Sequence, residues 1–126
     1  MISLALASAL LASAAGAPST AQPLRVYSTC VEGLIRTKLG EKLDAAAFEG
    51  QLAGACPAEA AAYRSALIQK ELSYGTRKAD AEKAAADEMT AYLVDMKKLY
   101  RTELARAQPP AAAAPVEVAQ QAPTGN

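Results

Sequence analysis

The feature that most constrains the fold is a pair of cysteines, Cys30 and Cys56, the only two in 126 residues. An even number of cysteines in a short exported chain is typical of a disulfide framework. A zinc site is a poor alternative, because the chain has no histidine to complete the ligand set. The spacing also differs from the Cys-x-x-Cys motif of redox-active thiols. We therefore predict one structural disulfide, Cys30–Cys56.

Helix lengths support this pairing. From Cys30 the predicted first helix continues to about Leu39, a distance of roughly 14 Å at the rise of an α-helix. After a turn, the second helix returns by roughly 16 Å over residues 45–55. Cys56 should therefore lie level with Cys30, as a disulfide requires.

The start of the chain indicates export. No charged residue precedes Arg25, and the opening residues are apolar and then small. This pattern predicts a signal peptide over residues 1–21 with cleavage after Ala21. Cleavage after Ala17 is the alternative. One feature departs from the usual signal peptide: the chain has no basic residue at its start. A membrane span is disfavoured, because the run is short and alanine-rich compared with the roughly 20 apolar residues that a bilayer needs. We expect a periplasmic or secreted protein.

The segment after the leader, residues 22–106, is expected to form one helical domain. Apolar residues at spacings of three and four mark one face of its first helix: Leu24, Tyr27, Val31, Leu34 and Ile35. Gly40 is expected to cap the end of that helix, and Asp44 the start of the next. The second helix should bury Phe48 and Leu52.

Pro57 suits the first position of a third helix. From there to about Arg106 the chain has no proline, and its only interruption lies around Gly75. The apolar stripe keeps its phase across this point: Tyr63 and Tyr92 differ by about 20° at 100° per residue. The cost of glycine in a helix and the length of an unbroken helix favour a break instead. On balance the phase favours a continuous or gently bent helix.

The final segment, residues 107–126, is rich in proline and alanine. The prolines of Gln108-Pro109-Pro110 are expected to end the preceding helix. We expect a disordered tail, because such a segment has little apolar surface to bury. The predicted fold class is thus all-α: a disulfide-stapled helical hairpin, a long helix that is continuous or broken near Gly75, and a disordered C-terminal tail.

Composition excludes several functions. The chain has 13 basic and 13 acidic side chains and so no net charge. It therefore lacks the excess positive charge that attracts proteins to nucleic acid or to an anionic membrane surface. The absence of histidine removes Ser–His and Cys–His catalysis. The glycines are scattered and form no phosphate-binding loop. We predict no catalytic residue, metal site or cofactor. An enzyme would need a pocket lined by two carboxylates with perturbed ionisation.

One apolar stripe near the C-terminus is the strongest candidate for a functional surface. Its spacing approximates a coiled-coil heptad, with Met and Tyr residues suited to adaptable contacts: Met89, Tyr92, Leu93, Met96, Leu99, Tyr100 and Leu104. On a continuous helix it would need a partner, either a second copy of the chain or another protein. Alternatively, it packs on the disulfide-linked hairpin as a fourth helix. We predict a non-enzymatic protein acting through helix-mediated interaction; the alternative is a chaperone-like or stress protein.

Overall fold

The computed structural model describes residues 18–109, and every regular element in that range is a helix. The predicted all-α fold is therefore confirmed. Most of the predicted signal peptide and most of the predicted tail lie outside the described residues. The helices, in chain order, are α1 (Ala21–Gly40), α2 (Ala45–Leu52), α3 (Pro57–Ser73) and α4 (Lys78–Ala107).

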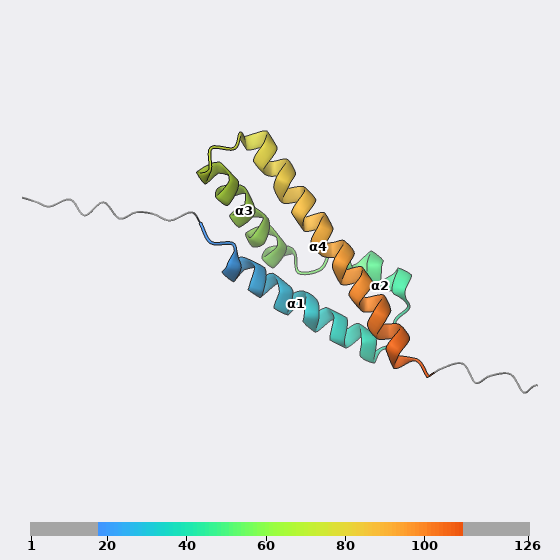
Figure 1. Cartoon of the computed structure of the whole chain (residues 1–126). Helices are drawn as coiled ribbons and strands as arrows, with labels where there is room; N and C mark the ends of the chain where they lie inside the picture. The colour runs from blue at the N-terminus through green and yellow to red at the C-terminus, as the bar shows by residue number, and fades with distance from the viewer. Residues whose placement is uncertain (1–17, 110–126) are drawn as a thin grey trace, which may run out of the picture.

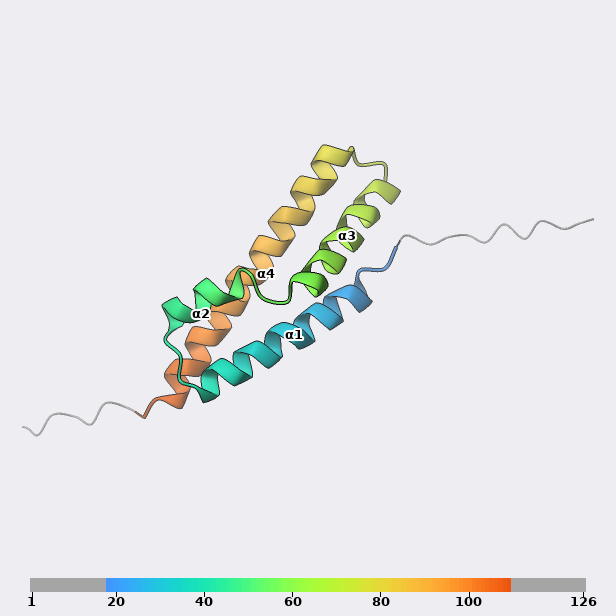
Figure 2. The ribbon, with the colours of Figure 1, turned by 180° about the vertical axis from the view of Figure 1, so that it is seen from behind.

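The chain passes three times along the molecule (Figures 1 and 2). Helix α1 runs one way, α2 and α3 return in succession, and α4 makes the third pass. With 30 residues, α4 is about 45 Å long. It contacts all three other helices: α3 along its N-terminal half, α2 along its C-terminal half, and α1. The molecule is thus organised on α4.

The Cys30–Cys56 disulfide is present, with 6.2 Å between its Cα atoms. It joins the middle of α1 to the residue before α3, as helix lengths predict. The second helix is shorter than expected, because α2 ends at Leu52 and a turn over residues 53–56 leads to Pro57. Closing a loop of this size stabilises the fold by about 3 kcal/mol in the chain-entropy picture.

The turn between α1 and α2 corrects one detail of the sequence analysis. Gly40 is the last helical residue, and the left-handed conformation that ends the helix falls on Lys42, with φ +53°. The amide of Leu43 then donates to the carbonyl of Lys38 at 3.0 Å, which satisfies a free carbonyl of the last turn. The predicted cap of α2 is confirmed: the carboxylate of Asp44 accepts a hydrogen bond of 3.0 Å from the third residue of that helix.

The preference for a continuous helix through Gly75 is wrong, because the chain reverses there and α4 runs back along α3. Gly75 adopts φ +84°, a left-handed conformation that glycine takes without steric cost. Its amide donates to the carbonyl of Leu72 at 3.0 Å, and the amide of Thr76 donates to that of Glu71 at 3.2 Å. These two bonds are the Schellman ending of a helix, so Gly75 terminates α3.

Positive charge at the start of α4 is unfavourable, because the helix dipole is positive at that end. The structure shows how it is offset. Arg77 forms an ion pair of 2.7 Å with Asp80, and Lys78 forms one of 2.6 Å with Glu82. Each carboxylate lies within the first turns of α4, where negative charge also favours the helix dipole.

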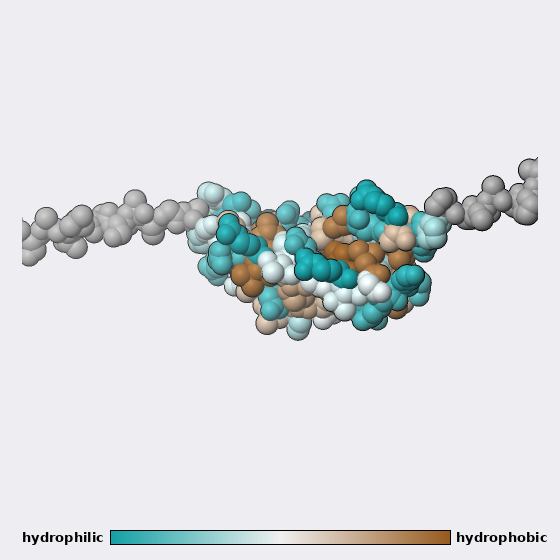
Figure 3. All heavy atoms as spheres, turned by 90° about the horizontal axis from the view of Figure 1, so that it is seen from below, coloured by the Kyte–Doolittle hydropathy of each residue, from teal (hydrophilic) through white to brown (hydrophobic). Residues whose placement is uncertain are grey.

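The buried core is small and rich in tyrosine. It gathers seven side chains from all four helices: Tyr27, Val31, Ile35, Phe48, Leu52, Tyr63 and Tyr100. Hydrophobic atoms also reach the surface, most visibly in the half of the molecule nearer the C-terminal end of α4 (Figure 3). The core is therefore covered incompletely, as expected for so short a chain.

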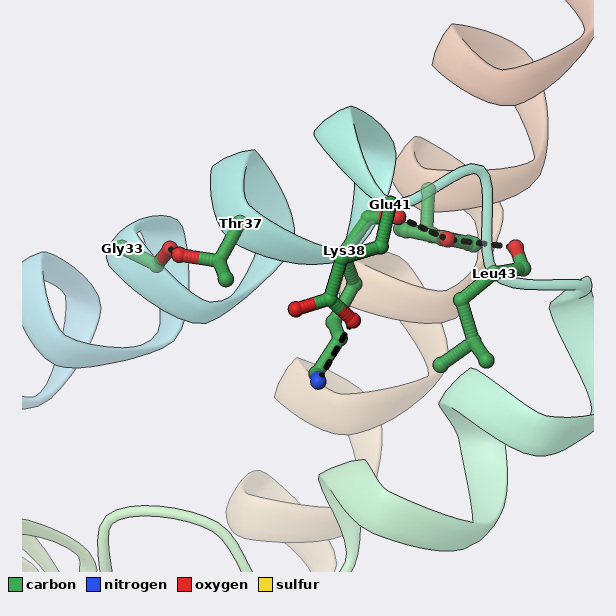
Figure 4. A network of polar contacts seen from close by, with 6 residues as sticks. Gly33, Thr37, Lys38, Glu41 and Leu43 are labelled. Atoms are coloured by element: carbon green, nitrogen blue, oxygen red, sulfur yellow. Dashed lines mark hydrogen bonds and ion pairs between the residues drawn. The ribbon is translucent and has the colours of Figure 1, made fainter.

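Tyr100 ties α4 to the α1–α2 turn. Its ring stacks on Phe48 of α2, with 3.8 Å between centroids and 9° between planes. Its hydroxyl lies 2.6 Å from the carbonyl oxygen of Leu43 and 3.2 Å from that of Lys38, and it can donate to either (Figure 4). Ring and hydroxyl together fix the end of the helical hairpin against α4.

We predict that Tyr100→Phe lowers the unfolding free energy by about 1–2 kcal/mol, because it removes the hydroxyl donor from the carbonyl of Leu43 while preserving the ring stack; the carbonyl of Lys38 keeps the amide of Leu43 as a donor. Urea denaturation followed by circular dichroism measures the change. The matched control is Tyr74→Phe, at a side chain that is 66% exposed, and it should shift stability by no more than about 0.5 kcal/mol. Equal losses in the two variants would contradict the assigned role of the hydroxyl.

Candidate functional site

A hollow of about 390 Å³ lies between α1, α3 and the N-terminal half of α4. This volume falls within the range of roughly 300–1,000 Å³ that is usual for binding sites. The apolar part of its lining comes from all three helices: Leu24, Leu67, Ala84 and Ala85. The polar part consists of Tyr63, Lys70, Glu71 and Glu88, together with Thr20, which lies within the predicted signal peptide and would be absent from a mature chain cleaved after Ala21.

The hollow exists because α1 and α4 diverge. They approach each other closely toward their C-terminal ends and separate toward their N-terminal ends, where α3 lies beside both (Figures 1 and 2). In that half, α4 presents small side chains: Ala81 and Ala85 are fully buried, with 0% and 1% exposure. At the hollow itself α4 contributes Ala84 and Ala85, whose methyl groups leave the space between α1 and α4 unfilled.

A cluster of three tyrosine rings lies beside the apolar floor. The Tyr27 ring is 6.2 Å from that of Tyr63 and 5.0 Å from that of Tyr92, between centroids. The Tyr92 hydroxyl donates to the hydroxyl of Ser28 at 3.3 Å, which links α4 to α1. This cluster separates the hollow from the rest of the core and gives it a rigid, aromatic base.

Opposite charges line the hollow without pairing with each other. In residues 18–109 neither Lys70 of α3 nor Glu88 of α4 forms an ion pair, whereas the carboxylate of Glu71 accepts a hydrogen bond of 3.1 Å from Thr76. Glu88 lies beside Tyr63, and Lys70 is two helical turns further along α3. The two free charges therefore lie about 10 Å apart along the hollow.

Burial raises the pKa of the Tyr63 hydroxyl, and the negative charge of Glu88 raises it further. Burial likewise raises the pKa of Tyr27 and Tyr92. These hydroxyls therefore stay protonated at neutral pH and act as hydrogen-bond partners. The arrangement suits the binding of a ligand with an apolar part and polar ends better than it suits proton transfer.

Cys30, Cys56 and Glu59 are the one group in residues 18–109 whose potential metal-binding atoms all lie within 4.8 Å of one another. The two sulfur atoms are bonded to each other, and a disulfide lacks the thiolate charge that binds metal ions. In the oxidised protein this group is a structural crosslink.

The structure places the predicted interaction stripe mostly inside the single chain. Tyr100 is fully buried, and five more of the seven residues pack partly buried against the core: Met89, Tyr92, Leu93, Met96 and Leu104. Leu99 remains 40% exposed. The reversal at Gly75 is the cause, because it folds the stripe back onto the hairpin, which is the alternative that the sequence left open.

The hollow was not predicted from the sequence. Its α3 residues, including Lys70 and Glu71, lie on a helix that was expected to continue straight into α4. The run of alanines at residues 84–86 was the one available signal, because small side chains permit close helix approach. Without the reversal at Gly75, nothing indicated which residues of α3 would face that run.

No protein-family profile, curated protein or solved structure matches the chain. Among residues 18–109, none of the helices is both long and apolar enough to cross a membrane. The candidate site therefore rests on its own geometry.

We predict that Glu88→Gln lowers the pKa of Tyr63, because it removes the negative charge that opposes deprotonation. Titration of carbon-13-labelled tyrosine rings by NMR resolves the individual hydroxyls. The control is Glu82→Gln, at a carboxylate that pairs with Lys78 outside the hollow. An unchanged Tyr63 titration in Glu88→Gln would show that the two side chains do not interact.

The same shift predicts how stability changes with pH. Above about pH 10 a tyrosine in the unfolded chain loses its proton before Tyr63 does in the folded protein. The unfolded state then binds fewer protons, so the unfolding free energy falls as pH rises until the folded pKa is passed. Glu88→Gln should make this fall smaller.

Proposed function

We propose that this chain is an exported, non-enzymatic protein that binds a helix of another protein chain in the hollow between α1, α3 and α4. The observation that supports this most directly is the hollow itself, which is lined by apolar side chains from α1, α3 and α4. A helix from another chain lying on this apolar floor would form a four-helix bundle with α1, α3 and α4. The binding of an amphipathic helix in an apolar groove is a common mode of recognition.

The charges define the kind of helix that fits. Lys70 and Glu88 stand about two turns apart on either side of the apolar floor. A helix with an apolar side chain at its centre, an acidic residue toward Lys70 and a basic residue toward Glu88 would complement all three features. Such pairing gives orientation more than affinity, because exposed ion pairs contribute little.

The chemistry of the hollow favours binding over catalysis. The chain has no histidine, and the raised pKa of Tyr63 makes its hydroxyl a poor base at neutral pH. Glu88 is exposed to solvent, and the carboxylate of Glu71 is held by Thr76. Neither carboxylate has the dry environment that usually makes one an effective general acid.

Two observations support export. The first is the uncharged apolar opening of the sequence, and the second is the Cys30–Cys56 disulfide, which persists in oxidising compartments. We assign the protein to the periplasm or the extracellular space on these grounds.

Expression in an exporting bacterial host should yield a mature chain that begins at Gln22, because Ala21 satisfies the small-residue rule for signal cleavage. Mass spectrometry of the purified protein measures its N-terminus. Ala21→Arg should prevent cleavage at this position, whereas Ala17→Arg should leave it intact. A product that begins at Pro18 would move the site to Ala17, and one that retains Met1 would contradict a cleaved leader.

Helix binding can be tested by selecting displayed peptides of about 20 residues, long enough for a stable bound helix, on the disulfide-bonded protein. We expect amphipathic helical sequences to be enriched. Ala84→Lys should weaken their binding about tenfold or more, because it places an ammonium group in the apolar floor. Ala86→Lys is the matched control, since Ala86 is also exposed on α4 but lies outside the hollow. Peptides that bind the two variants equally would refute the hollow as the binding site.

A further inference from the structure

We propose that the helix that occupies the hollow is the C-terminal half of α4 from a second copy of this chain, and that two copies form a two-fold symmetric dimer. This inference rests on the proposed function and names its partner. Three observations lead to it: an exposed leucine on α4, the position of that leucine relative to the hollow, and the charges on both.

Leu99 is an exposed large apolar side chain on the face of α4 that carries the hollow, whereas Val94, the other exposed large apolar side chain of α4, lies about 140° away around the helix. It is 40% exposed, in contrast to the other members of the predicted stripe. Glu88, which lines the hollow, lies 11 residues before Leu99, so the two differ by only about 20° around the helix. Ala84 differs from Leu99 by about 60° on the same basis. One face of α4 therefore carries a wall of the hollow near its start and an uncovered leucine near its end.

A two-fold axis perpendicular to α4 would bring the exposed Leu99 of each copy to the hollow of the other. If the axis passes at the level of Tyr92, midway between Ala85 and Leu99, the two α4 helices run antiparallel. Leu99 of each copy then lies level with Ala85 of the other, beside the exposed Ala84 of the apolar floor. The contact is isologous and closes on itself, which is the commonest symmetry of protein dimers.

The same register brings opposite charges together at the Lys70 end. Tyr63 lies beside Glu88 across the antiparallel pair α3 and α4, so Lys70, seven residues on, lies level with Ala81. Ala81 is 11 residues before the axis, and the partner's Glu103 is 11 residues beyond it. Glu103 of each copy therefore lies level with Lys70 of the other.

At the Glu88 end the register brings charges of both signs close to the carboxylate. The partner's Asp95 falls level with Met89 and the partner's Lys98 level with Ala86, about 1.5 Å and 3 Å along the helix axis from Glu88. These two charges oppose each other, so the attraction that sets the register comes from the Lys70 end. Within a single chain Lys98 lies 3.5 Å from Asp95, and Glu103 forms an ion pair of 2.6 Å with Arg106. Both are exposed pairs within one helix, which are weak enough to rearrange on association.

Sedimentation equilibrium of the disulfide-bonded protein, recovered after export, tests the dimer. We expect twice the monomer mass, and we expect Leu99→Lys to raise the dissociation constant about tenfold or more, because it inserts a charge into the apolar contact. Val26→Lys is the control: Val26 is 46% exposed, but it lies about 200° around α1 from Leu24 and so faces away from the hollow. A dimer that tolerates Leu99→Lys as well as Val26→Lys overturns the proposed contact.

Charge reversal tests the register. Lys70→Glu and Glu103→Lys should each weaken the dimer about threefold to tenfold, since each creates two like-charge contacts across the two-fold axis. The double variant should restore dimerisation, because both contacts then carry opposite charges again. Loss of fold in a single variant would not be reversed in this way, and circular dichroism shows whether the monomer is intact. Failure of the double variant to recover overturns the register.

The outcomes also separate this inference from the proposed function. A monomer at about 1 mM overturns the dimer. If selected helical peptides still lose affinity for Ala84→Lys in that case, the hollow binds a helix of another protein and the proposed function stands. If the protein is monomeric and the affinity of the selected peptides is unchanged by Ala84→Lys, both proposals fail.

Discussion

The rest of the structure depends on the packing of three helices against the single apolar stripe of α4. Toward the C-terminal end the stripe presents large side chains, and the stack of Tyr100 on Phe48 closes that half of the core. Toward the N-terminal end it presents Ala81 and Ala85, against which α3 approaches closely. A chain with only 5% aromatic residues cannot supply large side chains along all of α4. The difference between the two halves leads directly to the hollow.

The disulfide complements this division. The returning pass is broken between α2 and α3, so it lacks the continuity that would align one half of the molecule with the other. Cys56 lies at this break, and its bond to Cys30 ties the start of α3 to the middle of α1. On one side of the bond Tyr100 holds the α1–α2 turn, and on the other side Tyr63 packs near Tyr27. The crosslink therefore holds together the two ends of the core, one around Tyr100 and the other around Tyr63.

Local signals predicted the first half of the fold well. Asp44, Pro57 and the Cys30–Cys56 bond follow from capping preferences and helix lengths, which depend on short stretches of sequence. The phase of the apolar stripe failed at Gly75 for a physical reason. Two antiparallel helices that share a core also turn their apolar faces toward each other, so a preserved phase does not distinguish a straight helix from a reversal. The hollow could not be predicted either, because the proximity of Tyr63 to Glu88 depends on that reversal.

The hollow and the exposed Leu99 have a common origin in the length of α4. Helices α2 and α3 cover its two halves from one side, and α1 contacts it closely only toward the C-terminal end. The side of α4 that α1 leaves is open at the hollow, and further along the same helix face Leu99 remains uncovered. Both leave apolar surface in contact with water, which is unfavourable at roughly 25 cal/mol per Å². Because the two features lie on one face of one helix, a single antiparallel contact would remove both from water, whereas a partner that filled only the hollow would leave Leu99 exposed.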